Sequence, residues 1–164
     1  MKTISKILFL ATVLFAFSAC SSDDNSGNVA QPSAEFYVNA HVDGTGYSNS
    51  SYFDPTGMVV SGVLMVQSST DSGNSIQIQI PAFNGVGTYT SGNNNLTNGY
   101  INYLKKGSGL SFQTFTSVRG NGAVKVTEVT DTYVAGTFSA VAKENTESST
   151  ASVTIAEGSF KVKK

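Results

Sequence analysis

The chain from Glu35 onward alternates apolar and polar residues with a period of two. From Phe36 to Asp43 every second residue is apolar, which predicts a half-buried strand. Asp43-Gly44 is a turn signal directly after it. The alternation recurs over Ile76–Ile80, and Pro81 marks the end of that strand because proline cannot donate to a sheet.

Other segments also predict strands. Met58–Gln67 is apolar at both odd and even positions, which predicts one strand covered on both faces. Turns are predicted at Asp71–Asn74, at Lys106–Gly109, which would connect a hairpin, and at Asn121-Gly122. The remaining predicted strands are Gly85–Thr90, Tyr100–Lys105, Leu110–Val118, and segments starting at Val124, Val134 and Val153.

The total is about nine strands of ordinary length, and residues after the N-terminal leader show no period of 3.6. The sequence therefore predicts an all-β domain, an antiparallel β-sandwich or barrel.

The final strand contains a change of parity. Val153 and Ile155 are apolar at odd positions, whereas Phe160 and Val162 are apolar at even positions. A regular strand keeps one parity on each face, so all four can face the core only if an extra residue enters between them. We expect a bulge or sharp bend at Glu157-Gly158, with Phe160 buried.

The N-terminus has the pattern of an export signal. Lys2 and Lys6 precede the apolar run Ile7–Ala19, which is too short to span a bilayer and has the length of a secretory signal segment. Phe17-Ser18-Ala19-Cys20 resembles the bacterial lipobox, with cleavage between Ala19 and Cys20. The predicted organisation is a cleaved signal helix over residues 1–19, a flexible tether over 20–34 from lipidated Cys20, and a β-domain over 35–164.

Acylation of Cys20 would anchor the chain permanently, because two or more acyl chains hold a protein stably in a membrane. The alternative is a secreted protein with a free thiol, which is unusual in an exported chain. Ser21–Ser33 contains little apolar surface and is expected to remain a flexible linker. Ser21-Ser22-Asp23-Asp24 loosely resembles the export signal of surface lipoproteins, and a plain solvated linker is the alternative.

Charge and cysteine content exclude several classes. Removing Lys2 and Lys6 with the leader changes the formal net charge from −1 to −3, which argues against a nucleic-acid partner. Cys20 is the single cysteine, so no disulfide can form within the chain. Burial and hydrogen bonding must therefore hold the core.

Several short motifs resemble those of small Bacteroidota lipoproteins of unknown function. They are Val38-Asn39-Ala40-His41-Val42-Asp43-Gly44, Gly87-Thr88-Tyr89, Gly122-Ala123-Val124-Lys125-Val126-Thr127, Val134-Ala135-Gly136-Thr137-Phe138 and Glu157-Gly158-Ser159-Phe160. Together they span most of residues 36–162, and Tyr47 takes the place of the aromatic residue that usually follows the first motif. The resemblance implies a β-rich, lipid-anchored envelope protein, and it brings no catalytic residues.

His41 is the only histidine, and the alternation predicts that Asn39, His41 and Asp43 share a strand face. A histidine beside a carboxylate can bind metal or transfer protons. A zinc site needs three or four protein ligands, and no further His or free Cys is present in the domain to supply them. We therefore expect His41 to be an ordinary strand residue, and we expect no metal, no cofactor and no catalytic residues.

Tyrosine is abundant and tryptophan is absent. Tyrosine favours recognition surfaces because it offers rigid contact area with a polar tip, although strands also favour it. The seven are Tyr37, Tyr47, Tyr52, Tyr89, Tyr100, Tyr103 and Tyr133.

The sequence favours a non-catalytic binding or interaction domain, lipid-anchored in the outer membrane and facing outward. Its partner would be a small ligand or an envelope protein. An accessory or immunity-type protein that masks a partner is the alternative, and an enzyme using His41 is the third.

Overall fold

The computed structural model describes residues 35–164, and within this range it contains ten strands and no helix. The strands are β1 (Tyr37–Val42), β2 (Thr45–Ser48), β3 (Thr56–Val60), β4 (Val63–Ser69), β5 (Ser75–Ile80), β6 (Gly87–Gly92), β7 (Tyr100–Lys106), β8 (Phe112–Val129), β9 (Tyr133–Glu144) and β10 (Ser152–Lys163). The predicted all-β class is confirmed, with ten strands instead of about nine.

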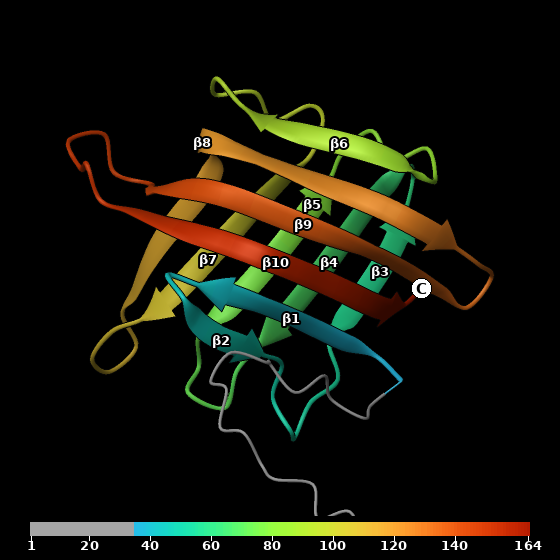
Figure 1. The fold of residues 1–164 in the computed structure, drawn as a ribbon, viewed down its shortest axis with the longest axis horizontal. Helices are drawn as coiled ribbons and strands as arrows, with labels where there is room; N and C mark the ends of the chain where they lie inside the picture. The colour runs from blue at the N-terminus through green and yellow to red at the C-terminus, as the bar shows by residue number, and fades with distance from the viewer. Residues whose placement is uncertain (1–34) are drawn as a thin grey trace, which may run out of the picture.

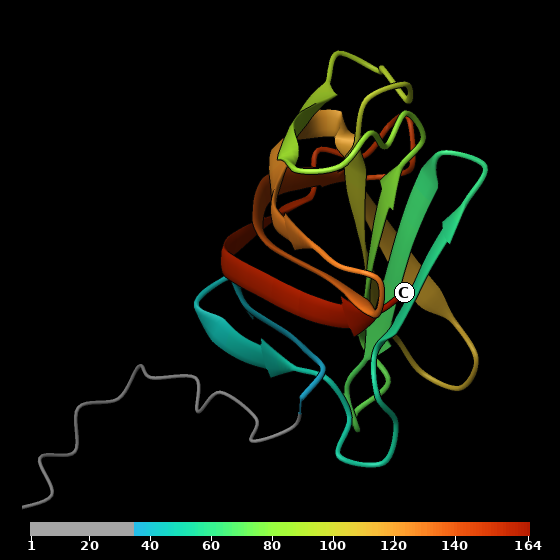
Figure 2. The same ribbon diagram turned by 90° about the vertical axis from the view of Figure 1, so that its right-hand side faces the viewer.

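The strands form one sheet that folds over into two layers. β6, the second half of β8, β9, β10 and β1 run across the front of the molecule, and β3, β4, β5 and β7 cross behind them (Figure 1). Figure 2 shows the two layers edge on. Neighbouring strands are antiparallel except at one point, where Lys163 of β10 pairs in parallel with Thr56 of β3 and joins the layers.

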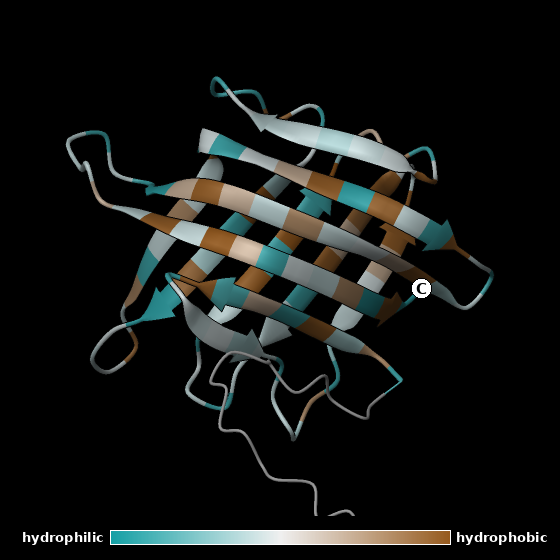
Figure 3. Cartoon of the chain, in the orientation of Figure 1, coloured by the Kyte–Doolittle hydropathy of each residue, from teal (hydrophilic) through white to brown (hydrophobic). Residues whose placement is uncertain are grey.

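The core lies between the layers and follows the strand alternation. On β4 and β5, Leu64, Val66, Ile76 and Ile78 are all at most 2% exposed, whereas the residues between them face outward. The hydropathy colours alternate in the same way along the strands (Figure 3). Because each strand places every second side chain inward, the two layers bury a continuous apolar core.

Met58–Gln67 is a hairpin, so the prediction of one strand covered on both faces is wrong. Ser61 and Gly62 have φ values of 50° and 76°, and they connect β3 to β4. Two consecutive positive φ values are typical of a two-residue hairpin turn. The chain reverses there, so the apolar residues of the two arms lie on different strands instead of opposite faces of one.

The predicted turn at Asn121-Gly122 is also wrong, because β8 continues through it. Thr116 pairs with Lys143 and Asn121 with Val141, so Ser117–Gly120 lie opposite Ala142 alone. The extra residues bend the strand. The first half of β8 pairs with β7 and the second half with β6, so this one strand belongs to both layers.

The predicted bulge in the last strand is confirmed. Ile155 pairs with Ala140 and Gly158 with Phe138, so Ala156 and Glu157 together lie opposite Ser139. Phe160 is fully buried, and Val153, Ile155 and Val162 are at most 5% exposed. Glu157, not the glycine, has the positive φ, at 53°.

Candidate functional site

A pocket of about 500 Å³ opens at one end of the molecule, and we call it the end pocket. The β1–β2 turn, the β4–β5 turn and β7 contribute its walls. The side chains that matter for its chemistry are Asp43, Tyr47, Asp71, Asn74, Tyr103 and Lys105. Its volume falls in the range of small-molecule sites.

Two buried tyrosines form the inner wall of the end pocket. The Tyr47 hydroxyl lies 2.7 Å from Ser68 Oγ and accepts a hydrogen bond from the Ile76 amide at 3.1 Å. Burial raises the pKa of Tyr47 to about 12. Burial also raises the pKa of Tyr103, and the negative charge of Asp43 raises it further. Both phenols are therefore neutral hydrogen-bonding groups at physiological pH.

The two carboxylates come from turns that are far apart in the chain. Asp43 follows β1 with a φ of 48°, and its Oδ1 accepts a hydrogen bond of 2.7 Å from the Thr154 amide. Asp71 accepts hydrogen bonds from the Ser50 hydroxyl and from the Ser51 hydroxyl and amide. The Ser50 bond is the main cause that lowers the pKa of Asp71.

Both carboxylates are thus fixed in position by hydrogen bonds to the protein. Lys105 of β7 adds a positive charge to the same pocket. The end pocket therefore presents charges of both signs beside two aromatic rings. This arrangement can hold a small polar molecule by hydrogen bonds and ring contacts.

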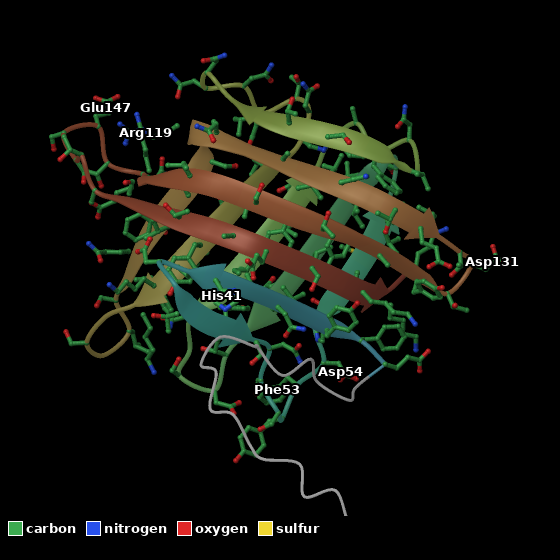
Figure 4. All side chains as sticks on the ribbon, viewed as in Figure 1. His41, Phe53, Asp54, Arg119, Asp131 and Glu147 are labelled. Carbon is green, nitrogen blue, oxygen red and sulfur yellow. The ribbon has the colours of Figure 1, made fainter. Side chains whose placement is uncertain are left out.

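Asn39, His41 and Asp43, which the alternation predicts on one strand face, do not form one site. Asn39 is only 6% exposed, and its Oδ1 has no hydrogen-bond partner in the part of the chain described. His41 lies on the front layer (Figure 4), with its Nδ1 3.2 Å from Glu157 Oε2. Asp43 turns away into the end pocket because β1 ends at Val42.

The bulge in β10 explains the contact of His41. Ala156 pairs with His41 across the strands, and the extra residue Glu157 follows it directly. The Glu157 side chain is 78% exposed, so its contact with His41 lies at the surface. The parity change in the sequence predicted the bulge, but the pairing of β1 with β10 could not be inferred from that change.

No sequence pattern predicted the end pocket as a whole. Its only signals were the turn motifs Asp43-Gly44 and Asp71–Asn74, each of which contains one aspartate and one glycine. Both motifs were correctly predicted as turns. Nothing in the sequence indicated that the two turns lie together.

The predicted lipid attachment at Cys20, the cleavage after Ala19 and the export signal Ser21–Asp24 lie outside the described residues. Over residues 35–164, no helix has the length and apolar character needed to cross a membrane. Within the same range, no three His, Cys, Asp or Glu side chains gather in a way that could hold a metal ion.

Residues 37–162 match one family model, described as Domain of unknown function (DUF6252). The match begins at the first residue of β1 and ends one residue before the end of β10, so it includes all ten strands of the described structure. No curated protein and no solved structure matches the chain.

Proposed function

We propose a binding function for this chain, which belongs to the DUF6252 family of domains of unknown function. The chain acts as a non-catalytic binding domain, and a small polar ligand occupies the end pocket. The observation that carries this proposal is the meeting of Asp43, Asp71 and Lys105 beside the rings of Tyr47 and Tyr103.

The chemistry of the end pocket favours a ligand with several polar groups. Its carboxylates accept hydrogen bonds, Lys105 donates them, and the Tyr103 phenol can do either. Each carboxylate is already oriented by the protein, so ligand binding needs little reordering of these groups. Amino acids and short peptides, which carry charges of both signs, are the first class to test.

The experiment is a screen by saturation-transfer NMR with the mature lipoprotein in detergent. The probes are free amino acids, dipeptides, polyamines and simple sugars. Thr45 lines the pocket and is exposed, so Thr45→Trp should fill the pocket without disturbing the core. Thr137→Trp, on the exposed face of β9, is the matched control.

We expect at least one probe to bind, with binding lost in Thr45→Trp and kept in Thr137→Trp. Binding that survives a filled pocket would place the ligand elsewhere. If no probe binds to the folded protein, a small polar ligand of these classes is excluded.

We further propose that Cys20 is lipidated and holds the domain in the outer membrane, facing outward. Support comes from the lipobox pattern of Phe17–Cys20 and from the polar composition of Ser21–Ser33, which gives a tether with a mean reach of about 20 Å. A binding domain on such a tether would sample molecules close to the membrane.

A second candidate function is the masking of a partner protein. Tyr52 and Phe53 are 80% and 77% exposed, side by side in the loop after β2 (Phe53 in Figure 4). The hydrogen bonds from Ser50 and Ser51 to Asp71 hold the start of this loop. Neighbouring exposed aromatic residues are typical of protein contacts.

This candidate is tested by in-cell crosslinking from a photoreactive residue at position 53, with position 127 on the exposed face of β8 as control. A discrete protein adduct from position 53 alone supports masking. Equal or absent adducts at both positions would leave the end pocket as the sole candidate site.

A further inference from the structure

The outer face of the back layer carries a row of uncharged polar side chains. Gln67 pairs with Gln77, Gln77 with Asn102, and Asn102 with Thr116, so the row crosses β4, β5, β7 and β8. Four adjacent strands place its ends roughly 14 Å apart, given the usual strand spacing. A parallel row pairs Met65 with Gln79 and Gln79 with Tyr100.

These rows form the floor of a groove, which we call the amide groove. One part, of about 650 Å³, is lined by Tyr100, Asn102 and Thr116 together with Asn94 and Asn145 from two loops. A smaller part, of about 240 Å³, continues over Gln67, Gln77 and Gln79 and shares Tyr100 and Asn102 with the first. The groove is therefore longer than one small ring-shaped molecule.

The loop on one side of the amide groove is held by local hydrogen bonds. The Asn94 amide donates to the Val118 carbonyl at 3.0 Å, and the Asn95 amide donates to the Gly92 carbonyl at 3.0 Å. Asn95 Oδ1 accepts hydrogen bonds from the Thr97 amide and hydroxyl. This wall is therefore shaped before any ligand arrives.

Arg119 holds the loop on the other side. Its guanidinium donates to the carbonyl oxygens of Glu144 and Thr146, and the Asn145 amide donates to the Thr114 carbonyl at 2.7 Å. Figure 4 shows Arg119 and Glu147 at this end of the molecule. Arg119 therefore stabilises this wall of the amide groove.

The floor of the amide groove is free of charge. Arg119 and Glu147, of opposite sign, are the charged side chains among its lining residues in the described structure. A charged partner would gain little from this surface, because complementary charge is what attracts such partners. A ligand with many hydrogen-bonding groups and no net charge fits it better.

Several amide side chains in the amide groove are available to a ligand. Over residues 35–164, those of Asn94, Asn102 and Asn145 make no hydrogen bond to the protein, although the backbone amides of Asn94 and Asn145 do. Each carboxamide both donates and accepts, and so does each hydroxyl of a sugar. We propose that the amide groove binds a neutral oligosaccharide, independently of the end pocket.

The test uses the mature lipoprotein in detergent, titrated with neutral oligosaccharides of glucose, mannose, galactose and xylose in several linkages. Oligogalacturonate serves as the acidic comparison. Binding is measured by calorimetry, and the contact surface is mapped by NMR shifts of the side-chain amides. Asn102→Leu and Asn145→Leu remove amides from the floor and the wall, and Asn121→Leu removes an exposed amide from the front layer.

We expect at least one neutral series to bind and to shift the amide signals of Asn102 and Asn145. Asn102→Leu should weaken binding at least tenfold, and Asn121→Leu should leave it unchanged. If Asn102→Leu does not fold, the affinity of Asn145→Leu and the NMR shifts of the unmodified protein decide whether the ligand lies in the amide groove. The proposal is overturned if no neutral series binds, if only the acidic oligosaccharide binds, or if neither groove variant weakens the binding.

Discussion

Gly158 of β10 lies directly against Phe138 of β9. A Cβ atom at Gly158 would lie 2.5 Å from the Phe138 carbonyl oxygen and 2.6 Å from its ring. The rings of Phe138 and Phe160 lie 6.4 Å apart in the core. The glycine is therefore required for close approach, while Glu157 adopts the left-handed conformation of the bulge.

Gly158→Val should destabilise the domain by about 1–3 kcal/mol, the usual range for overpacking a filled core. The strain comes from displacement of Phe138. Chemical denaturation measures the free energy of unfolding directly. Thr154→Val, on the exposed face of the same strand, should change it by less than about 0.5 kcal/mol. Equal effects of the two variants would contradict the packing argument.

Tyr47→Phe should lower stability by about 1–3 kcal/mol at neutral pH, because Ser68 and the buried Ile76 amide lose their common partner. Denaturant unfolding of both proteins gives this difference. An unchanged midpoint and slope would mean that water replaces the lost hydroxyl.

The same tyrosine predicts a dependence on alkaline pH. The pKa of Tyr47 rises from 10.0 to about 12 on folding, so above pH 10 the unfolded chain releases this proton before the folded one does. The contribution of Tyr47 to stability is complete below pH 10 and falls as pH rises toward 12. The stability gap between the wild type and Tyr47→Phe should therefore narrow across this window. A constant gap would show that Tyr47 titrates normally.

His41→Gln should change stability by less than about 1 kcal/mol, because its partner Glu157 is largely exposed and even a fully charged surface pair contributes little. Thermal unfolding at neutral pH measures the effect. Binding in the end pocket should persist in this variant. Loss of binding from a folded variant would instead assign His41 a functional role.

Cys20→Ala should release the protein from membranes, because the proposed lipid anchor would be lost. Metabolic labelling with a radioactive fatty acid and membrane fractionation test this directly. A wild type without label, or a variant that still pellets with membranes, would refute the lipid anchor.

The sequence by itself determined which side chains face the core on most strands. Alternation on Phe36–Val42 and Ile76–Ile80 is imposed locally by the pleat, so it can be interpreted without knowing the neighbours. The parity change between Ile155 and Phe160 revealed the bulge for the same reason. Asp43-Gly44 predicted a turn because few residues adopt its backbone conformation.

Only the tertiary structure decided which strands pair and where the concave surfaces lie. The apolar pattern of Met58–Gln67 is compatible with one strand or with the two arms of a hairpin. The strand β8 continues through Asn121-Gly122 because its two halves pair with different strands. Asp43 and Asp71 meet in the end pocket through the pairing of distant strands. Which strands lie together depends on contacts between distant parts of the chain, and these contacts produce no periodic pattern in the sequence. The pleat determines only to which face of a strand each side chain points.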